Sequence, residues 1–257
     1  MGGADRPVQD VRMQRFFLTH TAIIPGQAVD LTSLSHRLRT VLRLTPGDRI
    51  LLLDNTGFAY PTEILSLQRG SAQGRVWGRE SACGEPRLHL SLYLCALKAG
   101  KFEWVLQKGV EIGVSRFAPV ISSRTIVRPA QKITRKFERW RAIIREAAEQ
   151  CGRGRLPELA MPLAWAAALK DATGLRLMPW EENAGGGTTL GAALAAVAPT
   201  DACSLLIGPE GGITADEAAQ AADAGWQAVS LGPRILRAET AALVAAGLIL
   251  HRLGDLG

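Results

Sequence analysis

The hydrophobic pattern of the chain changes its period near Lys98. Residues 15–95 carry short alternating runs such as RFFLT, RILLLD and LHLSLYLC, which are separated by turn signals. These runs predict a small β-rich domain, a barrel, interrupted by one helix over residues 34–42. After Lys98, apolar residues at helical spacing alternate with short apolar runs, namely FAPVIS, LRLMPW, CSLLIG and QAVSLG. This alternation predicts an α/β domain with a mainly parallel sheet.

Composition excludes several classes of protein. The chain has 257 residues, of which 47% are hydrophobic, so it can bury a substantial core. Its apolar runs stay below the roughly 18 residues that a membrane span needs, and no apolar signal core opens the sequence. We therefore expect a cytoplasmic protein without a membrane partner. The 4 cysteines form no C-x-x-C pair and no cluster with the histidines, so we expect neither a disulfide framework nor a bound metal.

Basic charge is concentrated in the middle of the chain. The net charge is +6 overall, and lysines and arginines exceed carboxylates by 9 over residues 98–155, whereas residues 156–257 carry a net charge of −6. A cationic segment of this kind suits a polyanion, because neutralising phosphates releases counterions. A solvated helix face would have the same composition, and charge alone favours that reading.

Two similar stretches, LLIGPEGGIT at residues 205–214 and LGPRILRAETA at 231–241, each break an apolar run at Gly-Pro and lead into a helix. In parallel sheets, ligands bind at such loops beyond the carboxyl ends of the strands. Neither loop has the dinucleotide or P-loop pattern, which argues against a nucleotide-dependent enzyme. Tight turns alone would explain the glycines. They would not explain the polar side chains of Glu210, Arg234, Arg237, Glu239 and Thr240 in the same loops.

The two stretches resemble the signature segments of the bacterial 16S ribosomal RNA uridine N3-methyltransferase family, a branch of the SPOUT superfamily. Further segments agree in order along the chain, namely MQRFFL, VLRLTPGDRI, KFEWVLQKGVEIGVSRFAPVIS, RWRAIIREAAEQCGR and RLGDLG. The resemblance implies an α/β protein with a PUA-like RNA-binding β-barrel at 13–90 and a SPOUT methyltransferase domain with a deep trefoil knot at 91–257. It also implies a homodimer that uses S-adenosylmethionine. Residues 1–12 have no counterpart in the family, so we expect a polar extension there.

The resemblance further implies a reaction, methylation of N3 of one uridine (m3U1498 type) in the 16S RNA of the small ribosomal subunit. It places the cofactor in a cleft formed by three loops. The implied cofactor-binding residues are Leu177, Met178, Pro179, Trp180, Ile207, Gly208, Pro209, Glu210, Gly211, Gly212, Leu231, Gly232, Ile235, Leu236 and Thr240. Glycine-rich loops let a ligand approach the backbone, which supports this placement.

Uridine N3 carries its proton at neutral pH, so methyl transfer needs the lone pair freed and the charge developing on O2 or O4 stabilised. A fixed arginine near those oxygens would stabilise the charge and so ease release of the lone pair. The candidates are Arg237 and Arg234, which would lie within one turn of the methyl donor if their segment were helical. Arg15 is a candidate substrate contact from the barrel. Glu239 could accept the proton or orient an arginine. The alternatives are a surface arginine and a helix N-terminal pair formed by Glu239 and Thr240.

Candidate RNA contacts are spread over both domains. They are Arg15, Arg37, Arg39, Arg43, Lys98, Lys101, Lys108, Arg124 and Arg128. No aromatic RNA-reading motif is visible, which favours recognition by shape and phosphate positions. Glu146, Gln150 and Arg153 form either a helix end or a polar edge facing the cleft or the dimer partner. A 2′-O-ribose methyltransferase of the same superfamily and a non-catalytic RNA-binding protein remain as alternative functions.

Overall fold

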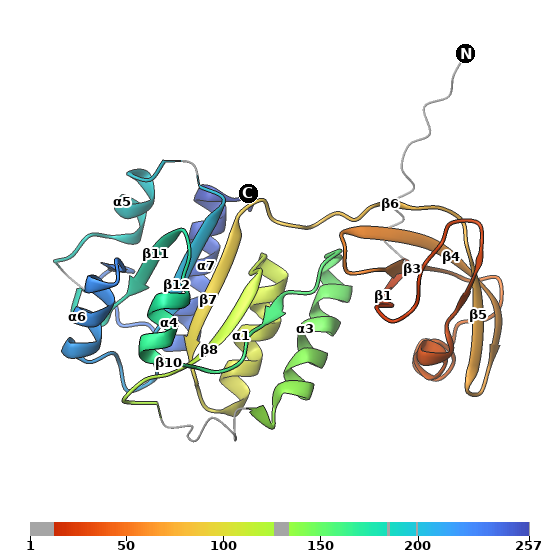
Figure 1. Cartoon of the computed structure of the whole chain (residues 1–257), viewed down its shortest axis with the longest axis horizontal. Coiled ribbons are helices and arrows are strands. Elements are labelled where there is room, and N and C mark those ends of the chain that lie inside the picture. Colours follow the sequence, from red (N-terminus) through yellow and green to blue (C-terminus); the bar gives the residue numbers. More distant parts are fainter. Residues whose placement is uncertain (1–12, 126–133, 184–185, 199, 257) are drawn as a thin grey trace, which may run out of the picture. The chain divides into compact units, whose positions relative to one another are not determined.

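The computed structural model describes residues 13–125, 134–183, 186–198 and 200–256, which form two compact units (Figure 1). The first unit comprises the chain up to Cys83 together with Gly152–Arg155, and the second comprises Gly84–Cys151 and Leu156–Gly257. The expected extension at residues 1–12 and the candidate Arg128 lie outside the described residues.

A six-stranded sheet forms the first unit. Its strands are β1 (Gln14–Phe17), β2 (Ala28–Asp30), β3 (Arg49–Leu53), β4 (Phe58–Gln68), β5 (Ser71–Val76) and β6 (Glu80–Ser81). The sheet order is β1-β3-β4-β5-β2, with β6 paired to β4; β1 and β3 run parallel and the other pairs antiparallel. Alternate side chains point into one apolar core that includes Phe16, Leu38, Ile50, Leu52 and Ile64. The predicted β-rich domain is therefore present.

The helix expected over residues 34–42 is present, since residues 32–41 are helical throughout, but it is wound differently. A 3-10 turn, η1 (Thr32–Leu34), precedes a π-helix, η2 (Arg37–Val41), in which the Leu42 backbone N–H donates to the Arg37 carbonyl at 3.0 Å. Only Leu38 of η2 is buried.

The segment Gly152–Arg155 comes from between two elements of the second unit. Its glycines allow the chain to pass close to the strands of the first unit, since a Cβ on Gly154 would lie 3.2 Å from the Gly57 Cα and would collide with Ala82. Arg153 is buried there, with 3% of its surface exposed. The first unit is thus completed by residues far along the sequence.

The second unit contains a seven-stranded parallel sheet. Its strands are β7 (His89–Cys95), β8 (Arg116–Ile121), β9 (Glu158–Leu159), β10 (Leu163–Ala164), β11 (Leu175–Pro179), β12 (Ala202–Ile207) and β13 (Gln227–Val229). The order is β10-β8-β7-β12-β11-β13, with β9 paired to β8. At the centre, β7 and β12 pair from His89 and Ala202 to Leu94 and Ile207. The mainly parallel sheet predicted from the sequence is therefore confirmed.

Helices cover both faces of this sheet (Figure 1). The elements are α1 (Ala99–Ile112), α3 (Phe137–Cys151), α4 (Trp165–Asp171), η3 (Glu181–Asn183), α5 (Leu190–Ala195), α6 (Ala215–Asp223) and α7 (Ala238–Leu253). On one face α7 packs on β7 and β12, α1 packs on α7, and α3 packs on α1 through stacked rings of Phe102 and Trp140. On the other face α4 and α6 bury Trp165 and Trp226. The helices thus cover the faces of the sheet, and loops follow the carboxyl ends of its strands.

Candidate functional site

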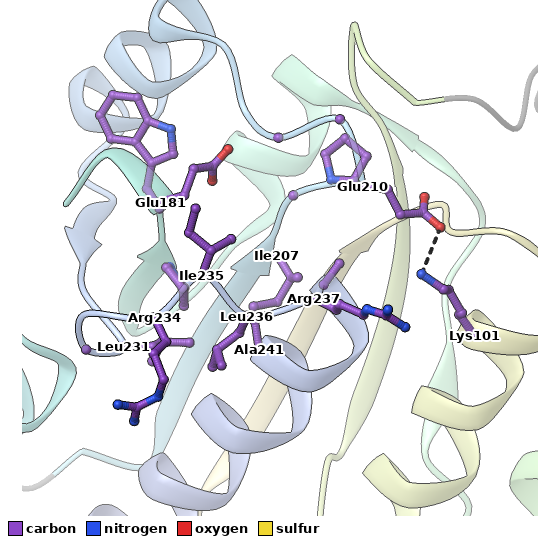
Figure 2. Close-up of a pocket in the computed structure, with 18 residues that line it drawn as sticks. Lys101, Glu181, Ile207, Glu210, Leu231, Arg234, Ile235, Leu236, Arg237 and Ala241 are labelled. Carbon is purple, nitrogen blue, oxygen red and sulfur yellow. Dashed lines mark ion pairs between the residues drawn. The ribbon is translucent and has the colours of Figure 1, made fainter. Parts of the chain in front are cut away.

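Three neighbouring strands, β12, β11 and β13, end beside one another, and the loops that follow them enclose a cavity of about 520 Å³ (Figure 2). The lining residues are Lys101, Pro179, Trp180, Glu181, Ile207, Gly208, Pro209, Glu210, Gly211, Gly212, Leu231, Gly232, Arg234, Ile235, Leu236, Arg237, Ala238 and Ala241. Both Gly-Pro loops singled out in the sequence therefore contribute to the same cavity.

The loop after β12 depends on its glycines. A Cβ on Gly208 would lie 2.7 Å from the Cγ1 of Ile213, which is itself buried, and Gly212 has a φ of 75°. The Gly212 N–H donates to the Pro209 carbonyl at 3.0 Å, which closes the turn. The Trp180 indole N–H donates to the Ile213 carbonyl at 3.3 Å, which ties the loop after β11 to this one. These contacts leave backbone groups facing the cavity.

The loop after β13 is extended. Arg237 is the N-cap of α7, with φ −63° and ψ 150°, and residues 231–237 contain no helical turn. The expectation that Arg234 and Arg237 share one turn depended on a helical segment, and this segment is not helical. In Figure 2 the two guanidinium groups point to opposite sides, that of Arg237 toward Lys101. Among the described residues, neither arginine forms an ion pair or side-chain hydrogen bond.

The segment that follows β8 forms hydrogen bonds with the loop after β12 and with the start of α6. The Arg124 guanidinium donates to the Gly211 carbonyl at 3.0 Å, and the Ser123 backbone N–H donates to Glu217 at 2.7 Å. Glu217 also forms the predicted capping box with Thr214 at the start of α6. Burial opposes ionisation of Glu217, but the hydrogen bonds from Ser123 and Thr214 outweigh it and lower its pKa. The carboxylate therefore stays charged and holds both segments.

Lys101 bridges two carboxylates at the edge of the cavity. Its ammonium lies 3.6 Å from Glu210 Oε1 (dashed in Figure 2) and 3.2 Å from Glu239 Oε1. Burial of Glu239 opposes its ionisation, but its own backbone N–H, Lys101 and Arg237 together lower its pKa. The site thus alternates positive and negative charge from Arg237 to Glu210.

Comparisons with known proteins agree with this geometry. Residues 84–250 match the RNA methyltransferase domain model, and residues 37–76 match the RNA methyltransferase PUA domain model. A ribosomal RNA small subunit methyltransferase E of Synechocystis sp. is 34% identical, over 95% of this chain and 81% of the relative. The chain belongs to the ribosomal RNA small subunit methyltransferase E family. This confirms the family resemblance seen in the sequence.

Solved structures of this type have the same fold. The methyltransferase E of Neisseria gonorrhoeae, bound to S-adenosyl methionine, is 34% identical and superposes with a TM-score of 0.85 over 96% of this chain and all of that one. A putative methyltransferase of Legionella pneumophila, in complex with the same cofactor, is 29% identical, with a TM-score of 0.87 over 96% of this chain and 100% of that chain. The α/β architecture with a PUA domain is therefore shown.

Most of the cofactor candidates of this methyltransferase E chain line the cavity, and three do not. Leu177 and Met178 lie within β11, 0% and 1% exposed, where they pack into the core. Thr240 lies on α7 outside the lining. Glu239 does not line the cavity but contacts it through Lys101. The sequence did not predict Lys101, Glu181, Ala238 and Ala241 as lining residues. Glu181 could have been included, because it directly follows the predicted lining residue Trp180.

Two of the four candidate RNA contacts of the first unit lie against other residues, and the other two are exposed. The Arg15 guanidinium lies close to Gly152, within 3.5 Å of the position that a Cβ there would take. Arg37 lies over the Phe16 ring at 5.0 Å, and Arg39 and Arg43 are exposed. All four belong to the same compact unit.

In the second unit, Lys98 is exposed and Lys108 forms an ion pair with Glu111 at 2.8 Å. Glu146 and Gln150 line a groove between α1 and α3. Among the described residues, no group of histidine, cysteine and carboxylate side chains could hold a metal ion, and no described helix is long and apolar enough to cross a membrane.

Proposed function

We propose that this chain transfers a methyl group from S-adenosylmethionine to N3 of a uridine in 16S ribosomal RNA (m3U1498 type). One observation carries the proposal. In a chain of the methyltransferase E family, both signature Gly-Pro loops line a single cavity at the ends of adjacent parallel strands. Two solved relatives with the same fold hold S-adenosylmethionine.

The residues present fit that cofactor. A cavity of about 520 Å³ is within the range of small-molecule sites. Gly232 has a φ of 105° and its missing Cβ would meet no atom within 4 Å, so the backbone there is open to a ligand. Leu231, Ile235 and Leu236 offer apolar surface for an adenine ring, while exposed backbone groups of the loops can bind its edges. When bound, the cofactor supplies an electrophilic methyl group on a sulfonium.

Arg237 suits the role of stabilising the uracil. Its guanidinium is exposed, lies at the cavity and has no ion-pair partner within the described part of the chain. Hydrogen bonds from a fixed cation to O2 or O4 would stabilise the charge that develops when the N3 proton passes to water. Glu239 is a weak base because its pKa is lowered, so we assign it to orienting the cations rather than accepting the proton. Arg234 is the second candidate for the arginine role.

We also propose the trefoil knot of the SPOUT superfamily. After the edge strand β13, the chain returns across the ends of β11 and β12 to α7, which packs at the sheet centre. The connection between β11 and β12 pairs with this returning segment, since the Leu190 N–H donates to the Ser230 carbonyl and the Ser230 N–H to the Thr188 carbonyl. Passage of the returning segment through that connection would form the knot.

We propose that the protein acts in the cytoplasm and that it is a homodimer. The α7 helix buries Ala242, Ala246 and Ile249 but leaves Val244 and Leu248 42% and 46% exposed. Apolar side chains on the outer face of a packed helix favour contact with a second copy. Sedimentation of an active 27.5 kDa monomer at micromolar concentration would contradict this assembly.

The RNA would contact basic side chains of both units, namely Arg15, Arg37, Arg39, Arg43, Lys98, Lys108, Arg124 and Arg128, the last of which lies outside the described residues. Those within the described residues are spread over loops, helices and strands, which suits phosphate positioning on an assembled small ribosomal subunit.

The decisive experiment incubates the protein with small subunits that lack the modification and with labelled cofactor, followed by nucleoside analysis of the 16S RNA. Label in N3-methyluridine is the expected result. Label in a 2′-O-methylated nucleoside would point to the ribose methyltransferase alternative. Absence of cofactor binding in calorimetry would favour the non-catalytic RNA-binding alternative.

A further inference from the structure

We infer that Lys101 is a positioning residue, which holds the Glu239 carboxylate and thereby leaves the Arg237 guanidinium free for the uracil. The inference rests on the proposed function, because it takes Arg237 as the group that contacts the substrate. It also replaces the expectation that Lys101 contacts RNA.

The location of Lys101 supports the inference. It lies on the first turn of α1, yet its ammonium reaches the loop after β12 through Glu210 and the first turn of α7 through Glu239. The side chain is 35% exposed, whereas those of Glu210 and Glu239 are 22% and 13% exposed. An ammonium that already lies between two carboxylates is attracted less strongly to a phosphate, because their negative charge offsets its own.

Glu239 needs a cation at this position. One of its oxygens, Oε2, is buried and has no hydrogen-bond partner among the described residues, so Oε1 carries the carboxylate's contact with Lys101. A buried carboxylate that loses its partner is costly and draws in the nearest available cation. Besides Lys101, Arg237 is the cation whose charge acts on Glu239.

Removing Lys101 would therefore change Arg237. Arg237 lies two residues before Glu239, and its guanidinium points toward Lys101 in Figure 2. Without the ammonium, the Glu239 carboxylate would pair with that guanidinium and withdraw it from the cavity. A second consequence is that Glu210 would lose its link to α1, although the Lys98 backbone N–H still donates to Glu210 at 3.4 Å.

The test compares four variants in single-turnover methylation of unmodified small subunits: Lys101→Ala, Lys101→Arg, Glu239→Gln, and the double variant Lys101→Ala with Glu239→Gln. We expect Lys101→Ala to slow the reaction at least about tenfold, a part of what losing an arginine outright costs. Lys101→Arg should keep most of the rate. The double variant should be faster than Lys101→Ala, because a neutral amide no longer captures Arg237.

Lys98→Ala serves as the comparison for an RNA contact, since Lys98 is exposed three residues earlier. Lys98→Ala should weaken binding to the small ribosomal subunit. It should also lower the slope of log affinity against log salt concentration by about one, the contribution of one phosphate contact. Lys101→Ala should change neither. A normal rate for Lys101→Ala would overturn the inference. So would a slower rate that Glu239→Gln does not restore and that comes with the same loss of RNA binding as Lys98→Ala.

A crystal structure of Lys101→Ala separates this inference from the proposed function. We expect the Arg237 guanidinium within hydrogen-bond distance of Glu239, whichever nucleoside the enzyme methylates. An Arg237 that keeps its wild-type position in that variant would overturn the inference even if uridine methylation is verified. Conversely, a wild-type enzyme that leaves uridine N3 unmodified would refute the proposed function without affecting this structural outcome.

Discussion

Glu217, on the first turn of α6, accepts a hydrogen bond at 2.7 Å from the backbone N–H of Ser123, 94 residues earlier in the chain. The same carboxylate completes the capping box with Thr214. One side chain thus fixes both the start of α6 and the segment whose Arg124 holds the Gly211 carbonyl. The loop after β12 is therefore supported from both of its sides.

Glu217→Ala should lower the free energy of unfolding by about 2 kcal/mol, because it leaves the Thr214 and Ser123 N–H donors without their acceptor and water can replace only part of it. Thr214→Ala should cost about 1 kcal/mol, the usual value for a lost N-cap. Asp216→Ala is the matched control, since Asp216 is an exposed acid on the same turn. Urea unfolding followed by tryptophan fluorescence measures all three, and equal values for Glu217→Ala and Asp216→Ala would contradict the anchoring role.

The contribution of Glu217 should depend on pH. Its pKa in the folded protein is lowered from the ordinary value of 4.5, so its stabilisation is complete above that value and is lost as the pH falls through the lowered folded-state pKa. The difference in unfolding free energy between wild type and Glu217→Ala should therefore be constant near neutral pH and shrink below about pH 4.5. A difference that grows on acidification would refute this assignment.

Gly208→Val should weaken cofactor binding at least about tenfold, or roughly 1.4 kcal/mol, because its Cβ would press on the buried Ile213. Gly211→Val should cost less, since its Cβ would lie 3.2 Å from the Arg124 Cβ and 3.5 Å from the Arg124 carbonyl oxygen, against 2.7 Å from Ile213 for Gly208. Gly191→Ala on α5 faces open space and is the control. Titration calorimetry with S-adenosylmethionine gives the affinities. Normal cofactor affinity for Gly208→Val would show that the loop is only a turn.

Arg237→Ala should slow single-turnover methylation by roughly 100- to 1000-fold, the cost of removing a positioned donor from developing charge. Arg237→Lys should recover part of the rate, because it keeps the charge but loses the planar fork. Arg234→Ala should have a smaller effect, since its guanidinium points to the opposite side in Figure 2. If only Arg234→Ala were slow, the uracil contact would be reassigned to Arg234.

Thiol reactivity should divide the cysteines by burial. Burial raises the pKa of both Cys95 and Cys203 to about 12, and the thiolate is the reactive form. Mass spectrometry after alkylation at pH 8 should therefore find both unlabelled in the folded protein, whereas the exposed Cys83 is labelled. Alkylation in urea is the control and should label all of them. Rapid labelling of Cys203 in the folded state would contradict its place in the core of β12.

The sequence predicted the elements with a strong local signal. The capping box at Thr214 and Glu217 and the apolar runs of β11 and β12 are local patterns, and the family resemblance added the loops that line the cavity. It did not predict that residues 152–155 complete the first unit, because that packing joins segments distant in sequence. It also did not predict the ion pairs of Lys101 with Glu210 and Glu239, because they span more than a hundred residues and leave no periodic pattern.

The order of the cavity segments along the chain has a consequence for biosynthesis. The wall formed by residues 231–241 is translated after every other lining segment, and β12 can join β7 only once the intervening helices and strands have been made. A nascent chain paused before residue 231 would already contain the whole first unit and all seven strands of the parallel sheet, since β13 ends at Val229. It would still have an open, unfinished cavity, so the enzyme should be unable to capture its methyl donor until this last wall has left the ribosome.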